Sequence, residues 1–284
     1  ESNNAMWSKK LQEAGVNVIF GVPGLKVHSK IGYIERKPEG KLAQKYVFIS
    51  TGNFHAGTAR VYTDYTYFTT NANIVNDIEQ VFKFFDVNYL NQNYKHLLVS
   101  PFGTRKKIVK MIKREIKNHQ AGLPAEINMK LNSLSDKEII DLLYKASQKG
   151  VTVRLVVRGI NSLIPGVEKL SENIHCVSVI DKFLEHPRVY WFKDGGNDKV
   201  YISSADIMGR NLDHRVEVSC PIYDTDLKQI IIDTFNLSFN DNVKGRKITA
   251  ESSLTYQKNN LPPNRSQYTT YEYFKQLNNK DNED

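Results

Sequence analysis

The chain has 284 residues, of which 39 are Lys or Arg and 31 are Asp or Glu, so its formal net charge is +8 and its pI is near 9.2. This length allows two domains with their own cores, and the positive balance indicates either a polyanionic partner or a solvated basic surface. Cys176 and Cys220 lie far apart in the sequence, which argues against a disulfide framework or a cysteine-based zinc site and fits a reducing cytoplasm.

The first third of the chain predicts mixed α and β structure. No signal peptide is visible, and no apolar run approaches the roughly 20 residues that a membrane span needs. The segment up to Glu13 has helical spacing and ends before Gly15, and the apolar residues 16–20 predict the first strand. Residues 60–65 alternate as a strand does, and residues 74–85 repeat apolar side chains at helical spacing.

A polar segment over residues 91–96 predicts a domain boundary, after which a new series of elements begins. The predicted elements are strands over 97–99 and 127–131, and helices over 104–118, from Ser135 and over 227–239. Ser135 and Glu138 predict a capping box, in which each side chain satisfies a free amide at the helix start. Beyond about Thr249 the composition shifts to Asn, Gln, Ser, Thr, Tyr and Pro, which predicts an extended or loosely packed tail.

Two histidines stand beside cations in strand-like sequence, His28 with Lys30 and His186 with Arg188. Because residues i and i+2 of a strand share a face, each imidazole points to the same side as its cation. Neutral imidazole can accept a phosphoryl group, and a neighbouring cation offsets the charge on the phosphate oxygens. The two pairs therefore indicate one bipartite site for chemistry at phosphorus. None of the seven His residues has a spacing that supports a zinc site.

The surroundings of the two pairs repeat. A helix-ending Gly followed by an apolar strand occurs at residues 15–20 and again at 150–155. After each His-bearing strand comes a turn, at 37–41 and at 193–198, which leads to a second strand that ends in hydroxyl groups. These strand ends are Ser50-Thr51-Gly52-Asn53 and Ser203-Ser204-Ala205-Asp206. Divergent internal duplication is the simplest account of the repeat.

Several strings in register resemble the polyphosphate kinases, a family with phospholipase D-like catalytic domains. They are Gly24-Leu25-Lys26-Val27-His28-Ser29-Lys30, Ser50-Thr51-Gly52-Asn53-Phe54, Val157-Arg158-Gly159-Ile160, Leu184-Glu185-His186-Pro187-Arg188-Val189-Tyr190 and Ser203-Ser204-Ala205-Asp206. The resemblance runs from about residue 1 to about residue 250. Family members are usually longer, so we expect this chain to be a carboxy-terminal catalytic portion that is weakly active or inactive alone.

The resemblance implies an α/β fold with two phospholipase D-like domains that are related by internal duplication, each with mixed sheets flanked by helices. The expected divisions are residues 1–93 for the first domain, truncated at its amino terminus, 94–250 for the second domain and 251–284 for the polar tail. The active site is expected in the cleft where the two His-bearing strands meet.

By this resemblance His28 is the phosphorylated nucleophile, and His186 is a general acid/base or a contact to the nucleotide phosphates. A nucleophilic imidazole needs a carboxylate or carbonyl on its other nitrogen. Asp64 and Glu217 follow the hydroxyl-rich strands and are the expected orienting carboxylates, with a surface salt bridge as the alternative. Phospholipase D relatives carry an Asp five residues beyond the motif Lys, where this chain has Glu35 in the first copy. We favour Asp64 and Glu217, and which one serves which imidazole stays open.

Cations and small donors near the strand ends are expected to bind phosphate. Arg158 follows an apolar run and precedes Gly159, which suits a bidentate phosphate clamp. By resemblance Arg158 and Tyr62 contact the nucleotide, although Tyr62 also fits a half-buried aromatic. The remaining predicted phosphate ligands are Lys30, Lys130, Asn132, Arg188, Asn53, Ser203 and Ser204. The basic helix over 104–118 is more typical of a solvated face than of a binding surface.

The resemblance implies reversible transfer of the terminal phosphoryl group of ATP to His28 and then to inorganic polyphosphate, with Mg²⁺ arriving on ATP. ATP, ADP and polyphosphate are the expected partners, nucleic acid is not, and a homo-oligomer is left open. One alternative is a phosphodiesterase or nuclease of the phospholipase D superfamily, which would hydrolyse a diester. The other is a non-catalytic polyanion-binding module, which would bind polyphosphate without forming phosphohistidine. The magnesium ligands and the preferred polyphosphate length stay open.

Overall fold

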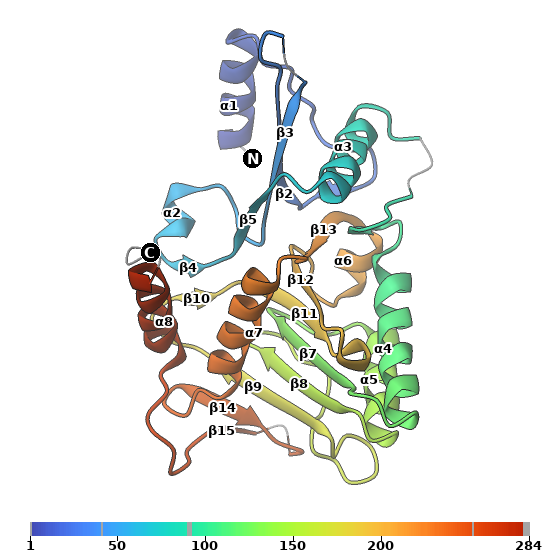
Figure 1. Cartoon of the computed structure of the whole chain (residues 1–284), viewed down its shortest axis with the longest axis vertical. Coiled ribbons are helices and arrows are strands. Elements are labelled where there is room, and N and C mark those ends of the chain that lie inside the picture. The colour runs from blue at the N-terminus through green and yellow to red at the C-terminus, as the bar shows by residue number, and fades with distance from the viewer. Residues whose placement is uncertain (1, 41, 90–92, 252, 281–284) are drawn as a thin grey trace.

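The main body of the protein is a ten-stranded mixed sheet (Figure 1). The structure is a computed structural model that describes residues 2–40, 42–89, 93–251 and 253–280. The strand order is β1-β13-β12-β11-β7-β8-β9-β14-β15, and β6 also pairs with β13. These strands are β1 (Lys26–Val27), β6 (Leu98–Ser100), β7 (Glu126–Leu131), β8 (Thr152–Val157), β9 (Ile174–Val179), β11 (Arg188–Phe192), β12 (Lys199–Ser203), β13 (Arg215–Pro221), β14 (Gly245–Ile248) and β15 (Leu254–Tyr256). The expected α/β architecture is confirmed.

Two smaller sheets and a set of helices complete the described fold. One sheet has the order β2-β3-β5, formed by β2 (Lys30–Arg36), β3 (Gln44–Ser50) and β5 (Thr66–Thr69). The other pairs β10 (Leu184–Glu185) with β4 (Tyr62–Thr63). The helices are α1 (Ser2–Glu13), α2 (Ala56–Ala59), α3 (Ala72–Asp86), α4 (Thr104–Gln120), α5 (Lys137–Gln148), α6 (Gly209–Asp213), α7 (Thr225–Phe239) and α8 (Ser266–Lys280), with a short 3₁₀ turn at Asp194–Gly196.

Helices cover both faces of the main sheet (Figure 1). Successive side chains of a strand point to opposite faces, and here both faces carry apolar side chains that need cover. On one face α4 and α5 bury side chains such as Ile112 and Leu143 against Leu155 of β8. On the other face α7 contributes Phe235 to a core that also contains Val156, the next residue of β8. This second core continues beneath the small β2-β3-β5 sheet, where α3 packs. The two halves of the chain therefore share one core.

The predicted internal repeat reappears in the strand registers. Lys30 lies opposite Ser50 across β2 and β3, as Arg188 lies opposite Ser203 across β11 and β12. The next strand repeats the correspondence, since Ser50 faces Thr66 of β5 and Ser203 faces Ser219 of β13. A helix follows in both copies, α3 in the first and α7 in the second. Corresponding side chains therefore occupy equivalent places in the two copies.

The copies exchange short strands. In β1, Lys26 and Val27 pair in parallel with Arg215 and Val216 of β13, which belongs to the second copy. In β10, the two residues of the second copy pair in parallel with β4 of the first copy. Each exchanged strand directly precedes a predicted active-site histidine. The exchange therefore brings the two His-bearing segments to the junction between the copies.

The predicted strand over residues 16–20 is wrong. These residues form no strand, and Val16, Ile19 and Phe20 are exposed, Phe20 to 75%. Apolar β-prone residues form a strand only where an edge offers hydrogen-bond partners, and no described strand lies alongside this segment. The corresponding segment of the second copy does form β8, whose two neighbours are β7 and β9.

The predicted capping box at α5 is also wrong. Asp136 is the residue that caps the helix, because its side chain accepts a hydrogen bond from the Ile139 amide. The backbone N–H of Ser135 instead donates to the Ile207 carbonyl, and Glu138 pairs with Arg105. An aspartate one position later therefore competes successfully for the cap. The predicted domain boundary lies partly in residues 90–92, which fall outside the described residues.

The prediction of a loosely packed tail after residue 250 is wrong for most of that segment. β15 pairs with β14, and α8 lies beside α7 (Figure 1). Asp241 connects these parts: its Oδ1 accepts hydrogen bonds from the amides of Val243, Lys244 and Gly245, and its Oδ2 accepts from the amide and hydroxyl of Ser266. A polar composition thus conceals an ordered helix anchored at a buried carboxylate. None of the described helices has the length and apolar character needed to cross a membrane.

We expect Asp241→Ala to lower the free energy of unfolding by about 2–4 kcal/mol, because several buried donors lose their acceptor together. Urea unfolding followed by circular dichroism measures the change. Glu172→Ala, at an exposed position, is the control and should stay within about 0.5 kcal/mol of the parent protein. Equal midpoints for the two variants would show that Asp241 does not anchor the segment.

Candidate active site

His28 lies directly after β1, where the exchanged strand meets β13. Its backbone N–H and that of Ser29 both donate to the Val216 carbonyl at 3.0 Å. The imidazole Nδ1 lies 2.9 Å from both carboxylate oxygens of Glu217, the next residue of β13. The carboxylate is buried, whereas 23% of the His28 side chain is exposed. The first histidine is therefore oriented by a carboxylate of the second copy.

His186 has the reciprocal arrangement. It follows β10, and its Nδ1 lies 2.7 Å from Oδ1 of Asp64, which follows the paired strand β4 of the first copy. Its side chain is 11% exposed. The structure thus pairs His28 with Glu217 and His186 with Asp64, which settles the geometric question that the sequence left open. Glu35 lies at the exposed end of β2, where it accepts a hydrogen bond from Tyr33.

Hydroxyl groups at the strand ends hold both carboxylates. Thr51 Oγ1 donates to Asp64 Oδ1 at 2.8 Å, and Ser204 Oγ donates to Glu217 Oε2 at 2.5 Å. Asn211 of α6 adds a third contact, from its Nδ2 to Glu217 Oε1 at 2.6 Å. Sequence reasoning missed Asn211, because nothing in its local sequence distinguishes it. It also missed the role of Thr51, although the hydroxyl-rich repeat contained the signal.

A carboxylate at Nδ1 determines the neutral tautomer of each imidazole. Nδ1 carries the proton and donates a hydrogen bond to the carboxylate, so Nε2 keeps its lone pair. In His186 the Arg188 guanidinium lies over the ring, because its Nη1 is 3.0 Å from Nε2 and 3.4 Å from Nδ1. Among the described residues no hydrogen bond reaches Nε2 of His28. The two imidazoles therefore differ in their surroundings, since a guanidinium lies over the His186 ring.

The cations beside the two imidazoles are themselves buried. Lys30 Nζ donates to the His28 carbonyl at 2.5 Å, and Arg188 Nη1 donates to the His186 carbonyl at 3.0 Å, so the copies again correspond. Burial lowers the pKa of Lys30 to about 8, although the nearby Glu217 carboxylate opposes this shift. Arg188 also reaches Asp206 through Nη2 at 3.1 Å, and its Nε is buried without a hydrogen-bond partner among the described residues. The site thus holds positive charge where phosphate oxygens would need it.

The remaining predicted ligands occupy varied places. Tyr62 lies with its ring centroid 5.2 Å from that of His186, and Arg158 Nε donates to the Glu185 carbonyl at 2.5 Å. Lys130 is buried and pairs with the Glu185 carboxylate at 2.7 Å, so its charge is already matched. Asn132 donates from Nδ2 to the His186 carbonyl at 3.3 Å.

Asn53 and Ser203 do not enter the hydrogen-bond network of the two imidazoles. Asn53 is exposed, and Ser203 instead bonds to the Ser219 hydroxyl within the sheet. The counterpart of Asn53 in the second copy is Asp206, which sequence reasoning did not select. Asp206 accepts hydrogen bonds from the amides of Asn132 and Ser133 as well as from Arg188.

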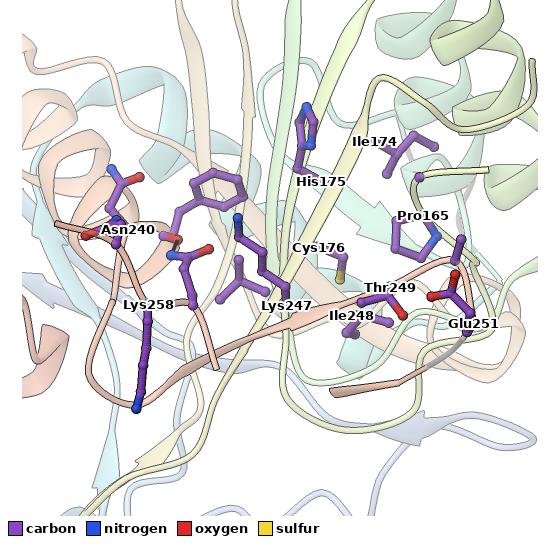
Figure 2. Close-up of a pocket in the computed structure, with 16 residues that line it drawn as sticks. Pro165, Ile174, His175, Cys176, Asn240, Lys247, Ile248, Thr249, Glu251 and Lys258 are labelled. Atoms are coloured by element: carbon purple, nitrogen blue, oxygen red, sulfur yellow. Dashed lines mark hydrogen bonds between the residues drawn. The ribbon is translucent and has the colours of Figure 1, made fainter. Parts of the chain in front are cut away.

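Two hollows have different relations to this network. A cavity of about 360 Å³ lies beside His186 and is lined in part by Tyr62, Asp64, Lys130 and Glu185. A separate hollow of about 540 Å³ is lined in part by β9 and β14. The side chains of His175 and Lys247 point to the same side there (Figure 2). None of the predicted site residues lines this second hollow. Of these two hollows, the smaller is therefore the one that predicted site residues line, all of them from the surroundings of His186.

The described residues offer no ready-made metal cage. No group of three or more His, Cys, Asp or Glu side chains among them is arranged to hold a metal ion. Asp64 and Glu217 each already bind an imidazole and a hydroxyl group. Mg²⁺ that arrives with a nucleotide takes most of its ligands from phosphate and water and needs only one or two protein carboxylates.

Two family models match this chain. The family model described as Polyphosphate kinase C-terminal domain 1 matches residues 1–91, and the model described as Polyphosphate kinase C-terminal domain 2 matches residues 97–267. The chain is 47% identical over 278 residues to the polyphosphate kinase of Escherichia coli strain K12, which covers 98% of this chain and 40% of that protein. The polyphosphate kinase of Salmonella typhimurium strain LT2 is also 47% identical, over 99% of this chain and 41% of its own length.

A solved structure shows the same fold. The crystal structure of polyphosphate kinase from Porphyromonas gingivalis has a TM-score of 0.91 and 37% sequence identity, over 96% of this chain and 42% of that chain. This chain therefore spans about two fifths of the length of the relatives that it matches.

We expect Lys30 to titrate near pH 8, well below Lys45, whose ion pair with Glu79 raises its pKa. The sign follows from burial, which disfavours the charged ammonium of Lys30, so its positive charge is lost as pH rises through about 8. Nitrogen-detected NMR of labelled lysine Nζ groups measures both titrations, with Lys30→Arg to assign the signal. A Lys30 titration indistinguishable from that of surface lysines would contradict the electrostatic picture of the site.

Proposed function

Because the chain belongs to the polyphosphate kinase family, whose C-terminal domains 1 and 2 it matches, we propose that it transfers the terminal phosphoryl group of ATP through His28 to inorganic polyphosphate, reversibly. The reciprocal His–carboxylate pairs are the observation that carries this proposal. Two imidazoles with fixed tautomers at one junction, next to buried cations, suit a two-step transfer through a covalent intermediate. The proposed place of action is the cytoplasm, a reducing environment that fits the two free cysteines.

The first step uses the lone pair on Nε2 of His28. This pair attacks the γ-phosphorus of ATP and forms a phosphorus–nitrogen bond, while the bond from the γ-phosphorus to the bridging oxygen breaks and ADP leaves with its electrons. Nδ1 keeps its proton, which forms a hydrogen bond to Glu217, so the carboxylate stabilises the positive charge that the ring gains. Lys30 offsets charge on the phosphoryl oxygens.

The second step returns the enzyme to its starting state. A terminal oxygen of polyphosphate attacks the phosphorus, the phosphorus–nitrogen bond breaks, and its electron pair returns to Nε2 of His28. The same steps in reverse make ATP from ADP and polyphosphate, so one nucleophile serves both directions. Mg²⁺ enters this scheme as part of the ATP substrate, where it bridges phosphate oxygens and offsets their charge.

We assign His186 to proton transfer or to contact with the nucleotide phosphates. Asp64 binds Nδ1 of this ring, and the Arg188 guanidinium lies over the ring face. A phosphate bound by Arg188 comes close to the ring, so that Nε2 can carry a proton to or from a phosphate oxygen. Tyr62, next to the His186 ring, and Arg158 are the proposed nucleotide contacts.

We expect His28→Ala to abolish both polyphosphate synthesis and its reversal in the full-length protein, because no other group accepts the phosphoryl group. Residual turnover above about one per cent would remove His28 as the nucleophile. His186→Ala should lose about 10²–10⁴-fold in rate, as is typical for loss of a general acid/base, yet still accept label on His28. Acid-labile label from γ-labelled ATP scores the intermediate, and ADP release scores turnover. Label in His28→Ala with none in His186→Ala would reverse the two roles.

Polyphosphate binding should weaken steeply as salt rises, since several phosphate contacts displace counterions. Lys30→Gln should reduce the slope of log affinity against log salt by about one, as expected for one lost phosphate contact. The matched control is Lys137→Gln, which removes an exposed lysine of α5 and should leave the slope unchanged. Filter binding at several salt concentrations measures both slopes. Salt-insensitive binding, or equal slopes for the two variants, would exclude Lys30 as a phosphate ligand.

A further inference from the structure

The C-terminal helix α8 lies against the second His-bearing segment. Its first residue, Ser266, is buried and donates hydrogen bonds from its backbone N–H and hydroxyl to Asp241 at 2.8 and 2.7 Å. Farther along, the Tyr273 hydroxyl donates to Asp233 of α7 at 2.8 Å. The match to the family model of C-terminal domain 2 ends at residue 267, so most of α8 lies outside it. The helix is therefore placed by contacts on both sides of the end of that match, from Ser266 within it and from Tyr273 beyond it.

Gln267 of α8 forms a three-point clamp on the segment before His186. Its Nε2 donates to the Phe183 carbonyl and to Glu185 Oε1, both at 2.8 Å, and its Oε1 accepts from the Phe183 amide at 3.0 Å. Both amide protons and the carbonyl oxygen of this side chain are thus used. A primary amide is suited to this place, because it alone offers two donors and an acceptor without charge.

Glu185 connects the Gln267 clamp to the residues around His186. Its second carboxylate oxygen, Oε2, accepts from Lys130 Nζ at 2.7 Å, and its backbone carbonyl accepts from Arg158 at 2.5 Å. Glu185 is only 8% exposed and belongs to β10, which pairs with β4 next to Asp64. Fixing both carboxylate oxygens of Glu185 therefore restricts the residue that directly precedes His186 and the strand pairing that brings His186 to Asp64.

The corresponding position in the first copy has no such clamp. Val27 precedes His28, is 37% exposed, and has a side chain that cannot form hydrogen bonds. The first His-bearing segment is held by backbone bonds to Val216 and by the imidazole contact with Glu217. The clamp is thus not a requirement of the repeated fold. It distinguishes the His186 copy from the His28 copy.

We propose that Gln267 is a positioning residue for His186: through Glu185 and the β10–β4 pairing it holds the imidazole against Asp64 for its part in phosphoryl transfer. This inference rests on the proposed function. It predicts that loss of the clamp lowers kcat more than it raises the KM for ATP, because His28 and Lys30 stay in place while Arg158 keeps its contact to the shifted Glu185 carbonyl. A displacement of about 1 Å at a reacting group can cost about 10²-fold in rate.

Gln267→Glu tests this proposal in the full-length protein. At high pH the new carboxylate faces the Glu185 carboxylate and repels it, whereas at low pH a protonated carboxyl restores one donor towards Glu185. We expect kcat relative to the parent protein to fall about 10- to 100-fold at pH 8 and to recover to within about threefold at pH 6. Gln267→Leu, which provides no donor at any pH, should show a similar loss at both pH values.

Gln276→Glu is the matched control, because Gln276 is an exposed residue of the same helix. It should follow the parent protein at both pH values. An identical pH profile for Gln267→Glu and Gln276→Glu would overturn the proposal, and so would a loss expressed in KM alone. A pH-independent loss in Gln267→Glu that matches a lowered melting temperature would assign Gln267 a purely structural role and would also overturn it.

The proposed function is tested separately in the same experiment. Acid-labile label on His28 of the parent protein supports the phosphohistidine pathway, whatever the Gln267 variants do. Absence of that label in an active parent protein would refute the proposed function. Label in the parent protein together with unaltered Gln267 variants would refute the role of Gln267 alone.

Discussion

A nucleophilic imidazole needs one ring nitrogen with its lone pair and a fixed partner for the other, and in this protein the partner always comes from the opposite copy. Glu217 of the second copy holds His28, and Asp64 of the first copy holds His186. Both contacts depend on two-residue strands, β1 and β10, that cross to the neighbouring copy. Neither copy alone contains a complete histidine–carboxylate pair. The need to orient two imidazoles therefore explains why the two repeats share one core rather than folding as separate units.

The same junction concentrates buried charge. Lys30, Arg188, Glu217 and Asp206 are all nearly inaccessible to water, and such groups are costly to bury unless each finds partners of opposite charge or hydrogen bonds. Arg188 donates a hydrogen bond to Asp206, and the negative charge of Glu217 acts to raise the pKa of Lys30. Burial nevertheless lowers that pKa to about 8. The charges are thus arranged before any phosphate binds. A preorganised site of this kind stabilises developing negative charge without having to reorient solvent or side chains.

Sequence reasoning was most successful where the repeat supplied an internal comparison. The spacing of His28 with Lys30 and of His186 with Arg188, followed by hydroxyl-rich strand ends, predicted side chains that the structure brings together at one junction. It could not assign the carboxylates to their imidazoles, because that pairing depends on strand exchange between residues more than 120 positions apart. Asn211 escaped notice for a similar reason, since only the folded chain places α6 beside Glu217.

The errors in the fold have local physical causes. Residues 16–20 have the composition of a strand but no described neighbouring strand to pair with. Ser135 resembles a helix cap, yet Asp136 is one position nearer to the amides that need an acceptor. The polar residues after 250 suggested a loose tail because helix α8 gains its place from buried polar anchors, Asp241 and Glu185, rather than from an apolar stripe. Composition alone does not reveal such anchors.

The repeat is symmetric in backbone and asymmetric in environment, and this difference fits the separate roles proposed for the two histidines. Nε2 of His28 has no hydrogen-bond partner among the described residues, and the residue before it, Val27, is partly exposed. His186 is less exposed, the Arg188 guanidinium lies over its ring, and Glu185 before it is held by Lys130 and Gln267. A nucleophile must accept a bulky phosphoryl group and release it again, which favours the open position. A proton-transfer group needs a constant distance to its partner, which favours the clamped one. The environments of the two histidines therefore agree with the roles proposed for them, since the described residues form the clamp in only one copy.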